Sequence, residues 1–391
     1  MNKAILNTDI QSFIDNNINK EPVKLILKGS PFVLVNIQEI VEQIISKKKC
    51  EKKLPAWFRT ASIYYPNKLN IEQTSSEITA KYKANLVSGN SLIDITGGFG
   101  VDCFYFSKKI KNVTHCEIES DLSNIVNYNY KIMQVENVKT IPQNGMDYLE
   151  KEHNKYDWIY ADPSRRSDEK GKVFLLEDCL PNIPKNLNHL FQFTDNVLLK
   201  VSPLLDISAS TKALFNTKEI HVIAVNNEVK ELLFVLQKNY RDEIYLSTVN
   251  IKKETSEMFG SPLELNNKAS YALPNTYLYE PNAAILKAGL FKEVSFQLNI
   301  DKLHINSHLY TSSDLIEFPG RRFKILESTA LDKKKLLKII PARKANITTR
   351  NFPQTVAQIR KKTGISEGGN VYLFFTTNIH NKHIALVCEK V

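Results

Sequence analysis

The sequence has few cysteines and no long apolar run. Its five cysteines, spread over 391 residues without Cys-x-x-Cys spacing, predict reduced thiols and argue against a disulfide framework or a zinc site. No stretch approaches the length of a membrane span, and the first residues, MNKAILNTDIQSF, are too polar for a signal peptide. With 42% hydrophobic and 24% charged residues, the composition is typical of a globular protein of two or three domains. We therefore expect a cytoplasmic protein that does not bind membranes.

Acidic residues are scarce in one segment near the C-terminus. From residue 321 to 362, thirteen Lys and Arg stand against two acids, which gives +11 where the whole chain has +10. The rest of the chain therefore sums to −1. A solvated helix face would explain the run Lys333–Lys335, but a cluster this one-sided, interleaved with Phe323 and Phe352, favours a surface that binds a polyanion. The residues that we expect to contact this polyanionic substrate are Arg321, Arg322, Arg360 and Lys361.

Glycines are also few, thirteen in all, and three of them stand together in SLIDITGGFGV, residues 91–101. The apolar residues before them and the amphipathic stretch after them predict a buried strand that leads into a helix through a tight corner. Glycine suits such a corner because the backbone turns sharply and lies close to a bound ligand. A purely structural turn is the alternative interpretation.

Two ligand-binding patterns are candidates for this corner. The dinucleotide fingerprint requires a further glycine where Cys103 stands, so its spacing fails. The corner instead resembles the Asp-x-Gly-x-Gly-x-Gly pattern of class I S-adenosylmethionine methyltransferases. Asp94, Gly98 and Gly100 match that pattern, while Thr96 replaces the first glycine, a departure that RNA methyltransferases also show. We therefore expect S-adenosylmethionine as the cofactor, bound by these four residues.

Two acids further along are candidates for the nucleoside of that cofactor. Glu117 lies seventeen residues beyond Gly100, close to the usual spacing for a carboxylate that binds a ribose diol, with Glu119 and Asp121 as nearby rivals. Asp147 follows the third predicted strand, where such enzymes often contact the adenine amino group. An N-cap of the next helix is an equally good interpretation of Asp147.

The segment YDWIYADPSRR predicts a buried strand that ends at Asp162 and Pro163. Ligands bind at the carboxyl ends of the strands in open α/β sheets, so we expect these two residues to be catalytic. Arg165 and Arg166 are expected to bind a substrate phosphate, with a salt bridge at a helix start as the alternative. The second proline and the aromatic residue of amino-methylating enzymes (Asp/Asn-Pro-Pro-aromatic) are missing, which leaves the acceptor atom open. Ser202 stands where uracil-C5 methylation would need a cysteine, which excludes that chemistry.

Other polar residues give weaker signals. Lys200 and Asp206 flank the end of the next predicted strand, where they would shape the acceptor pocket or be structural. Two histidine pairs have ligand-like spacing but no third ligand nearby, so we expect no metal. They are His304 with His308 and His380 with His383.

Several segments, in their order along the chain, carry a resemblance to a known family. They are EQTSSEITAKYKA, DITGGFGVD, ADPSRR, KVSPLLDI and NNEVKELL, followed by YLYEPNAAILKAGLF, FPGRRF and RNFPQTVAQIRKKTGISEGGNVYLFFT. They resemble bacterial class I S-adenosylmethionine-dependent methyltransferases with a C-terminal THUMP-like domain, from about residue 55 to the C-terminus. The resemblance implies a Rossmann-like methyltransferase core and a tail of a type associated with RNA.

The expected fold class is α/β, a Rossmann-like doubly wound sheet of seven strands closed by an antiparallel edge hairpin. An N-terminal helical segment precedes it and small α+β modules follow. Residues 250–268 are predicted to be a polar linker, and VSFQLNI a short strand. The expected domains are helical 1–75, methyltransferase 76–248, ferredoxin-like 249–318 and THUMP-like 319–391.

These observations predict an S-adenosylmethionine-dependent methyltransferase that acts on RNA, either tRNA or rRNA, through a basic C-terminal module. One alternative keeps the donor site but replaces RNA with a protein or a small molecule. Another is a non-catalytic RNA-binding protein on a methyltransferase fold.

Overall fold

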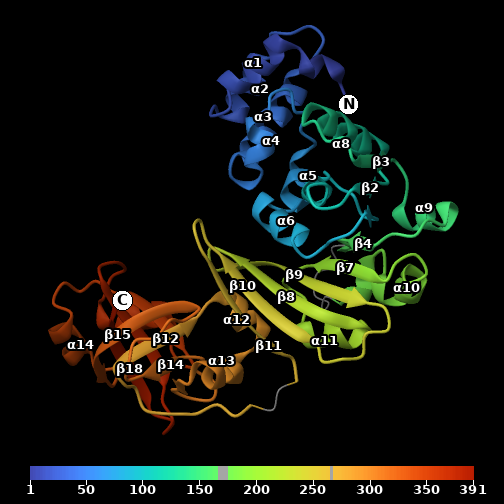
Figure 1. Cartoon of the computed structure of the whole chain (residues 1–391). Coiled ribbons are helices and arrows are strands. Elements are labelled where there is room, and N and C mark those ends of the chain that lie inside the picture. The colour runs from blue at the N-terminus through green and yellow to red at the C-terminus, as the bar shows by residue number, and fades with distance from the viewer. Residues whose placement is uncertain (166–174, 265–266) are drawn as a thin grey trace. The chain divides into compact units, whose positions relative to one another are not determined.

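The structure is a computed structural model that describes residues 1–165, 175–264 and 267–391. The chain divides into two compact units (Figure 1). The first comprises Met1–Lys218 and Leu233–Arg241, and the second comprises Glu219–Leu232 and Asp242–Val391.

The chain begins with helices, as the sequence predicts. These are η1 (Lys3–Leu6), α1 (Thr8–Asn16), α2 (Pro22–Lys28), α3 (Ile37–Lys53), α4 (Pro55–Arg59), α5 (Lys68–Gln73) and α6 (Glu77–Ala84). Apolar residues at helical spacing, such as Ile10 and Ile14 of α1 and Ile40 and Ile44 of α3, form a core of their own. Ser76 caps α6 by accepting a hydrogen bond from the Thr79 N–H. The N-terminal segment is therefore a small helical cluster that leads directly into the first strand.

Strands and helices then alternate and build one sheet. The strands are β1 (Ser91–Asp94), β2 (Asn112–Cys116), β3 (Val138–Ile141), β4 (Trp158–Ala161), β7 (Asn196–Val201), β8 (Thr217–Val225), β9 (Glu228–Gln237), β10 (Tyr245–Ile251) and β11 (Ser256–Pro262). The helices between them are α7 (Val101–Phe106), α8 (Ser120–Ile132), α9 (Gly145–Glu152), α10 (Ile183–Leu190) and α11 (Ile207–Ala213). Two short strands, β5 (Ser164–Arg165) and β6 (Cys179–Leu180), pair separately, and η2 (Leu176–Asp178) precedes β6.

The order in this sheet is β11-β10-β8-β9-β7-β4-β1-β2-β3. β1 lies between β2 and β4 and is parallel to both, so Asp94 at its end lies opposite His115 and Tyr160. The order reverses direction at β1, which is the position where open α/β sheets bind ligands. The predicted α/β fold class is confirmed.

Among the described residues this sheet has nine strands instead of the expected seven, and it differs from the expectation at the edge that β10 and β11 form. β10 is parallel to β8, and β11 is antiparallel to β10, so the β8–β9 hairpin is not at the edge. The predicted linker over 250–268 is therefore wrong over β11. One of its two buried residues is the polar Ser261, whereas the apolar Met258 is 64% exposed, so the apolar residues of β11 do not mark its buried face.

The C-terminal half builds a second sheet of seven strands. These are β12 (Tyr277–Pro281), β13 (Asp301–Lys302), β14 (Tyr310–Ser312), β15 (Gly320–Thr329), β16 (Asn346–Arg350), β17 (Val371–Thr377) and β18 (His383–Lys390). The helices are α12 (Ala283–Ala288), α13 (Phe291–Leu298), α14 (Lys333–Ile339) and α15 (Val356–Thr363). The order is β13-β14-β12-β15-β18-β17-β16, so the expected domain boundary at residue 318 falls inside one sheet.

This second sheet separates two apolar cores because side chains alternate along its strands. Leu373 and Phe375 of β17 pack into the core beneath α14 and α15, whereas Phe374 between them packs into the opposite core with Phe323. The predicted strand VSFQLNI is wrong: these residues lie in α13 and the turn after it, where Val294 and Ser295 are buried while Phe296 is exposed. No helix in the described residues is long and apolar enough to cross a membrane.

The turn between β8 and β9 generates a test of the fold. Asn226 and Asn227 both adopt left-handed backbone conformations, with φ of 51° and 66°. The Asn227 side chain also accepts a hydrogen bond from the Ala283 N–H at 2.8 Å, at the start of α12. Asn227→Gly keeps the backbone conformation but removes this bond, so we expect a loss of about 1 kcal/mol in urea unfolding.

Asn226→Gly is the matched control, since the same backbone freedom is gained there without loss of the bond to Ala283. We expect its stability to stay within about 0.5 kcal/mol of the wild type. Equal losses in the two variants would contradict a stabilising role for the Asn227 side chain.

Candidate functional site

The glycine corner after β1 combines close packing with open space. Gly97 has φ +25° and a Cβ there would collide with the backbone oxygen of Cys116, while a Cβ on Gly100, at φ +77°, would collide with the Tyr130 hydroxyl. Gly98 also has a left-handed φ, +62°, but the nearest neighbour of a Cβ there would be the Thr96 carbonyl oxygen at 4.0 Å. Gly97 and Gly100 are therefore required by packing, and Gly98 leaves room for a ligand.

Asp94 is buried at the carboxyl end of β1. Its Oδ1 accepts hydrogen bonds from the backbone N–H and from the hydroxyl of Thr96, both at 2.9 Å, and Cys103 Sγ lies 3.4 Å from Oδ2. Burial raises the pKa of Asp94 to about 7, against the effect of the Thr96 hydrogen bonds and with a contribution from the charge of Asp102. This carboxyl group is therefore partly protonated near neutral pH.

Glu117 follows β2 and lies beside the same corner. Its Oε2 accepts a hydrogen bond from the Gly98 N–H at 2.7 Å, and its Oε1 accepts one from the Glu119 N–H at 2.8 Å. Burial raises the pKa of Glu117, although the two backbone N–H groups oppose that shift. Each carboxylate oxygen keeps a lone pair, so this carboxylate can accept two hydroxyl groups of a diol. The rivals Glu119 and Asp121 are exposed.

Asp147 lies in the first turn of α9 and its side chain is exposed. The N-cap of α9 is Asn144, whose Oδ1 accepts hydrogen bonds from the Met146 and Asp147 N–H groups. The N-cap interpretation of Asp147 is therefore wrong, and its assignment to the adenine stays a prediction.

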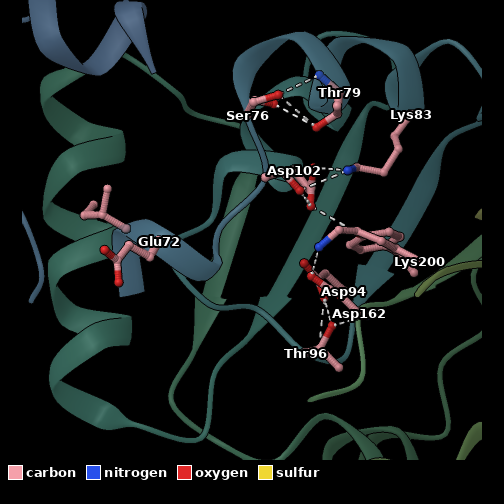
Figure 2. Close-up of polar contacts among 12 residues, drawn as sticks. Glu72, Ser76, Thr79, Lys83, Asp94, Thr96, Asp102, Asp162 and Lys200 are labelled. Carbon is pink, nitrogen blue, oxygen red and sulfur yellow. Dashed lines mark hydrogen bonds and ion pairs between the residues drawn. The ribbon is translucent and has the colours of Figure 1, made fainter. Parts of the chain in front are cut away.

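Asp162 and Pro163 follow β4, with the Asp162 side chain partly exposed and Pro163 buried. The Asp162 N–H donates to the Thr96 Oγ1 at 2.8 Å, and its carboxylate forms an ion pair with Lys200 of β7. The structure thus joins Asp94, Thr96 and Asp162 through hydrogen bonds, with Lys200 paired to Asp162 (Figure 2). Asp206 has a separate role, as the N-cap of α11.

A buried polar network beneath this site was not predicted. Asp102 of α7, 8% exposed, accepts hydrogen bonds from the Ser75 hydroxyl at 2.7 Å and the Tyr160 hydroxyl at 2.8 Å, and pairs with Lys83 of α6 at 3.1 Å. Burial alone would raise the pKa of Asp102, yet the charges of Lys83 and Lys200 and the two hydroxyl groups hold it below its ordinary value. The sequence does contain one indication of this network: Asp102 is an acid within the apolar stretch VDCFYF, and a buried carboxylate needs polar partners.

Figure 2 shows Lys83, Asp102, Lys200 and Asp162 as a column of alternating charge that ends beside Asp94 and Thr96. These side chains come from α6, α7, β7 and the ends of β1 and β4. The sequence segments EQTSSEITAKYKA, DITGGFGVD, ADPSRR and KVSPLLDI therefore meet at one place.

The predicted RNA-contacting residues are engaged to different degrees. Arg321 binds Glu280, a buried carboxylate that also pairs with Arg350 at 2.8 Å. Arg322 pairs with Glu317 at 2.7 Å, and Arg360 donates to the backbone oxygens of Ile365 and Ala345. Lys361 is exposed on α15. Three of the four side chains therefore have structural partners, and their role toward RNA stays a prediction.

Exposed lysines on α14 and α15 are an additional basic feature. Their ammonium groups make no hydrogen bond or ion pair with any residue that the structure describes. They are Lys333, Lys334, Lys335, Lys338, Lys361 and Lys362.

The remaining predicted residues give no further site. Arg166 lies outside the described residues, as does the side chain of Arg165 in β5. His304 uses both ring nitrogens, with Asn381 at 3.0 Å and Asn351 at 2.9 Å. Among the residues that the structure describes, no cluster of three or more His, Cys, Asp or Glu could hold a metal.

The chain is similar to known protein families and to solved structures. A family model described as a ferredoxin-like domain matches residues 277–319, and one described as THUMP domain-like matches residues 320–390. A crystal structure of the "putative methyltransferase" of Porphyromonas gingivalis W83 is 30% identical to the chain, with a TM-score of 0.89. The match covers 100% of this chain and 98% of that one.

More distant solved structures match part of the chain. The tRNA m1G37 methyltransferase of M. jannaschii is 12% identical over 43% of this chain and 51% of its own, with a TM-score of 0.31. An rRNA methylase from Streptococcus thermophilus is 11% identical over 41% and 94%, with a TM-score of 0.30. No curated protein sequence matches the chain.

The buried network generates a test of stability. Lys83→Met keeps the length of the side chain but leaves the buried Asp102 without its closest cation. We expect a loss of about 3 kcal/mol in urea unfolding, because the buried Asp102 carboxylate loses its ion-pair partner and the charge of Lys200 compensates it only in part.

Lys81→Met is the matched control on the same helix. Lys81 pairs with Glu77 but is 58% exposed, so its replacement should cost less than about 1 kcal/mol. A Lys83→Met protein as stable as the control would show that Asp102 does not depend on Lys83.

Proposed function

The chain belongs to the methyltransferase family that ends in ferredoxin-like and THUMP-like domains, and from this premise we propose that it transfers the methyl group of S-adenosylmethionine to RNA. The observation that carries the donor part is the arrangement of two carboxyl groups around an open glycine. Asp94 accepts the Thr96 N–H and Glu117 accepts the Gly98 N–H, so both carboxyl groups bind the backbone of the corner, and a Cβ on Gly98 would meet open space.

The donor set fits S-adenosylmethionine by its chemistry. Glu117 binds the ribose hydroxyls, since both of its oxygens are already oriented by backbone N–H groups. Asp94 lies beneath the amino-acid end, and the exposed carboxylate of Asp147 accepts the adenine amino group. When bound, this cofactor would supply a methyl group on a sulfonium: the acceptor would attack the methyl carbon in line, and the C–S bond would break with its electron pair staying on the thioether sulfur of the departing S-adenosylhomocysteine.

The acceptor side is formed by Asp162 and Pro163. The Asp162 carboxylate is 35% exposed and is held on one side by Lys200, so it can accept a hydrogen bond from the group to be methylated. Orienting that group toward the donor is the main contribution expected of the protein in such a displacement.

RNA as the substrate is supported by the basic surface of the second unit. The six exposed lysines of α14 and α15 form no ion pair with an acidic residue of the described chain. The two helices pack against the same apolar core. Unpaired ammonium groups on adjoining helices attract phosphates regardless of sequence. The THUMP-like match over residues 320–390 covers the same two helices.

Donor binding is tested by calorimetric titration with S-adenosylmethionine. We expect micromolar binding by the wild-type protein and none by Gly98→Arg, because the new side chain fills the open space at the corner. Gly289→Arg is the matched control, since Gly289 has φ +74° and nothing near its Cβ position, so it brings the same backbone strain far from the corner in sequence. Absence of binding by the wild type, or equal loss in both variants, would refute the donor site.

RNA binding is tested through its salt dependence. Replacement of Lys333, Lys334, Lys335 and Lys338 by Gln should reduce the slope of log affinity against log salt by about 0.7 for each RNA phosphate that is no longer neutralised. Donor affinity should not change. The control replaces four exposed lysines of the N-terminal helical cluster, and it should leave the slope unchanged. These control positions are Lys3, Lys20, Lys24 and Lys28. An unchanged slope in the α14 variant would remove this helix from the interface.

A further inference from the structure

Thr96 occupies the first glycine position of the donor-site pattern, and its side chain has two hydrogen-bond partners. The hydroxyl donates its single hydrogen to Asp94 Oδ1 at 2.9 Å. The same oxygen accepts a hydrogen bond from the Asp162 backbone N–H at 2.8 Å. One side chain therefore connects the end of β1 with the end of β4 (Figure 2).

We propose that Thr96 is a positioning residue that fixes the acceptor-side Asp162 to the donor-side Asp94. The inference rests on the proposed function, because it assigns the two sides of the site by their roles in methyl transfer. It also differs from the expectation that Thr96 contacts the cofactor, since its hydroxyl is already used within the protein.

The chemistry of the hydroxyl group makes this connection specific. The hydroxyl hydrogen is oriented by Asp94 Oδ1, which also accepts the Thr96 backbone N–H, so the residue is held by one side-chain and one main-chain bond to the same oxygen. The remaining lone pairs then point toward a donor, and the Asp162 N–H supplies it. Glycine at this position would leave that N–H without its acceptor.

Lys200 completes the arrangement from the other side. Thr96 holds the backbone of Asp162, and Lys200 holds its carboxylate through an ion pair. Asp162 is thereby fixed at two points, one on its main chain and one on its side chain. Because rates of transfer between two bound groups fall steeply when one is displaced by about 1 Å, losing either point should slow transfer more than it weakens donor binding.

The experiment compares Thr96→Val, which removes the hydroxyl at nearly constant volume, with Thr96→Ser, which keeps it. Donor affinity is measured by calorimetry, and methyl transfer by uptake of labelled methyl groups into total RNA from cells that lack the gene. We expect Thr96→Val to bind the donor within about twofold of the wild type and to lose between about tenfold and a hundredfold in maximal rate. Thr96→Ser should restore the rate.

Three outcomes would overturn the inference. A Thr96→Val protein with the wild-type rate would show that the connection is not used, while leaving the proposed function intact. Weakened donor binding that accounts for the whole loss would make Thr96 a cofactor contact. A wild-type protein that binds no donor would remove the proposed function and this inference together.

Amide hydrogen exchange of the peptide that contains Asp162 gives a readout that needs no RNA substrate. Exchange of the Asp162 amide in the donor-bound protein should be faster in Thr96→Val than in the wild type and Thr96→Ser. Equal exchange in all three proteins would also overturn the inference.

Discussion

The buried charge of Asp102 is the constraint on which the rest of the site depends. A carboxylate that is 8% exposed needs cations and hydroxyl groups around it, and these come from distant parts of the chain. Lys83 lies in α6 and Ser75 in the loop before it. Tyr160 lies in β4, and Lys200, whose charge also acts on Asp102, lies in β7. The contacts that stabilise the Asp102 carboxylate therefore hold together the elements whose ends form the candidate donor and acceptor sides.

The same charge has a second effect, on Asp94. The pKa of Asp94 is raised to about 7, chiefly by burial and further by the nearby charge of Asp102. The network that assembles the site thus also keeps the carboxyl group at the end of β1 partly protonated near neutral pH. By contrast, Asp162 at the end of β4 is partly exposed and has Lys200 beside it. Two carboxyl groups connected through Thr96 thereby occupy different electrostatic surroundings, one buried and one partly exposed.

Most of the fold and part of the site could be predicted from the sequence. Strong local patterns, such as the run of apolar residues before Asp94 and the glycines after it, correctly predicted the parallel core of the sheet. β11 and α13 are missed because polar residues occupy buried positions, Ser261 in β11 and Ser295 in α13, while apolar Met258 and Phe296 are exposed. Within the site, the sequence marks Asp94, Thr96 and Asp162 as candidates but not the hydrogen bond from the Asp162 N–H to Thr96, because a contact between residues 66 apart in the chain has no local sequence pattern. The ion pair between Lys83 and Asp102 is missed for the same reason, because it forms only when α6 and α7 pack together. For the tail arginines, formal charge alone does not show that Arg321 and Arg360 have partners within the fold.

The two C-terminal family models meet between residues 319 and 320, yet the sheet continues across that point. β12 of the ferredoxin-like segment is antiparallel to β15 of the THUMP-like segment over five residue pairs, from Tyr277 with Lys324 to Pro281 with Gly320. Transplanting the THUMP-like segment alone into another protein would expose the backbone N–H and C=O groups of β15 as an unpaired edge, which invites aggregation. The two segments are therefore separable as sequence families but inseparable as folding units, and any exchange between proteins has to move them as a pair.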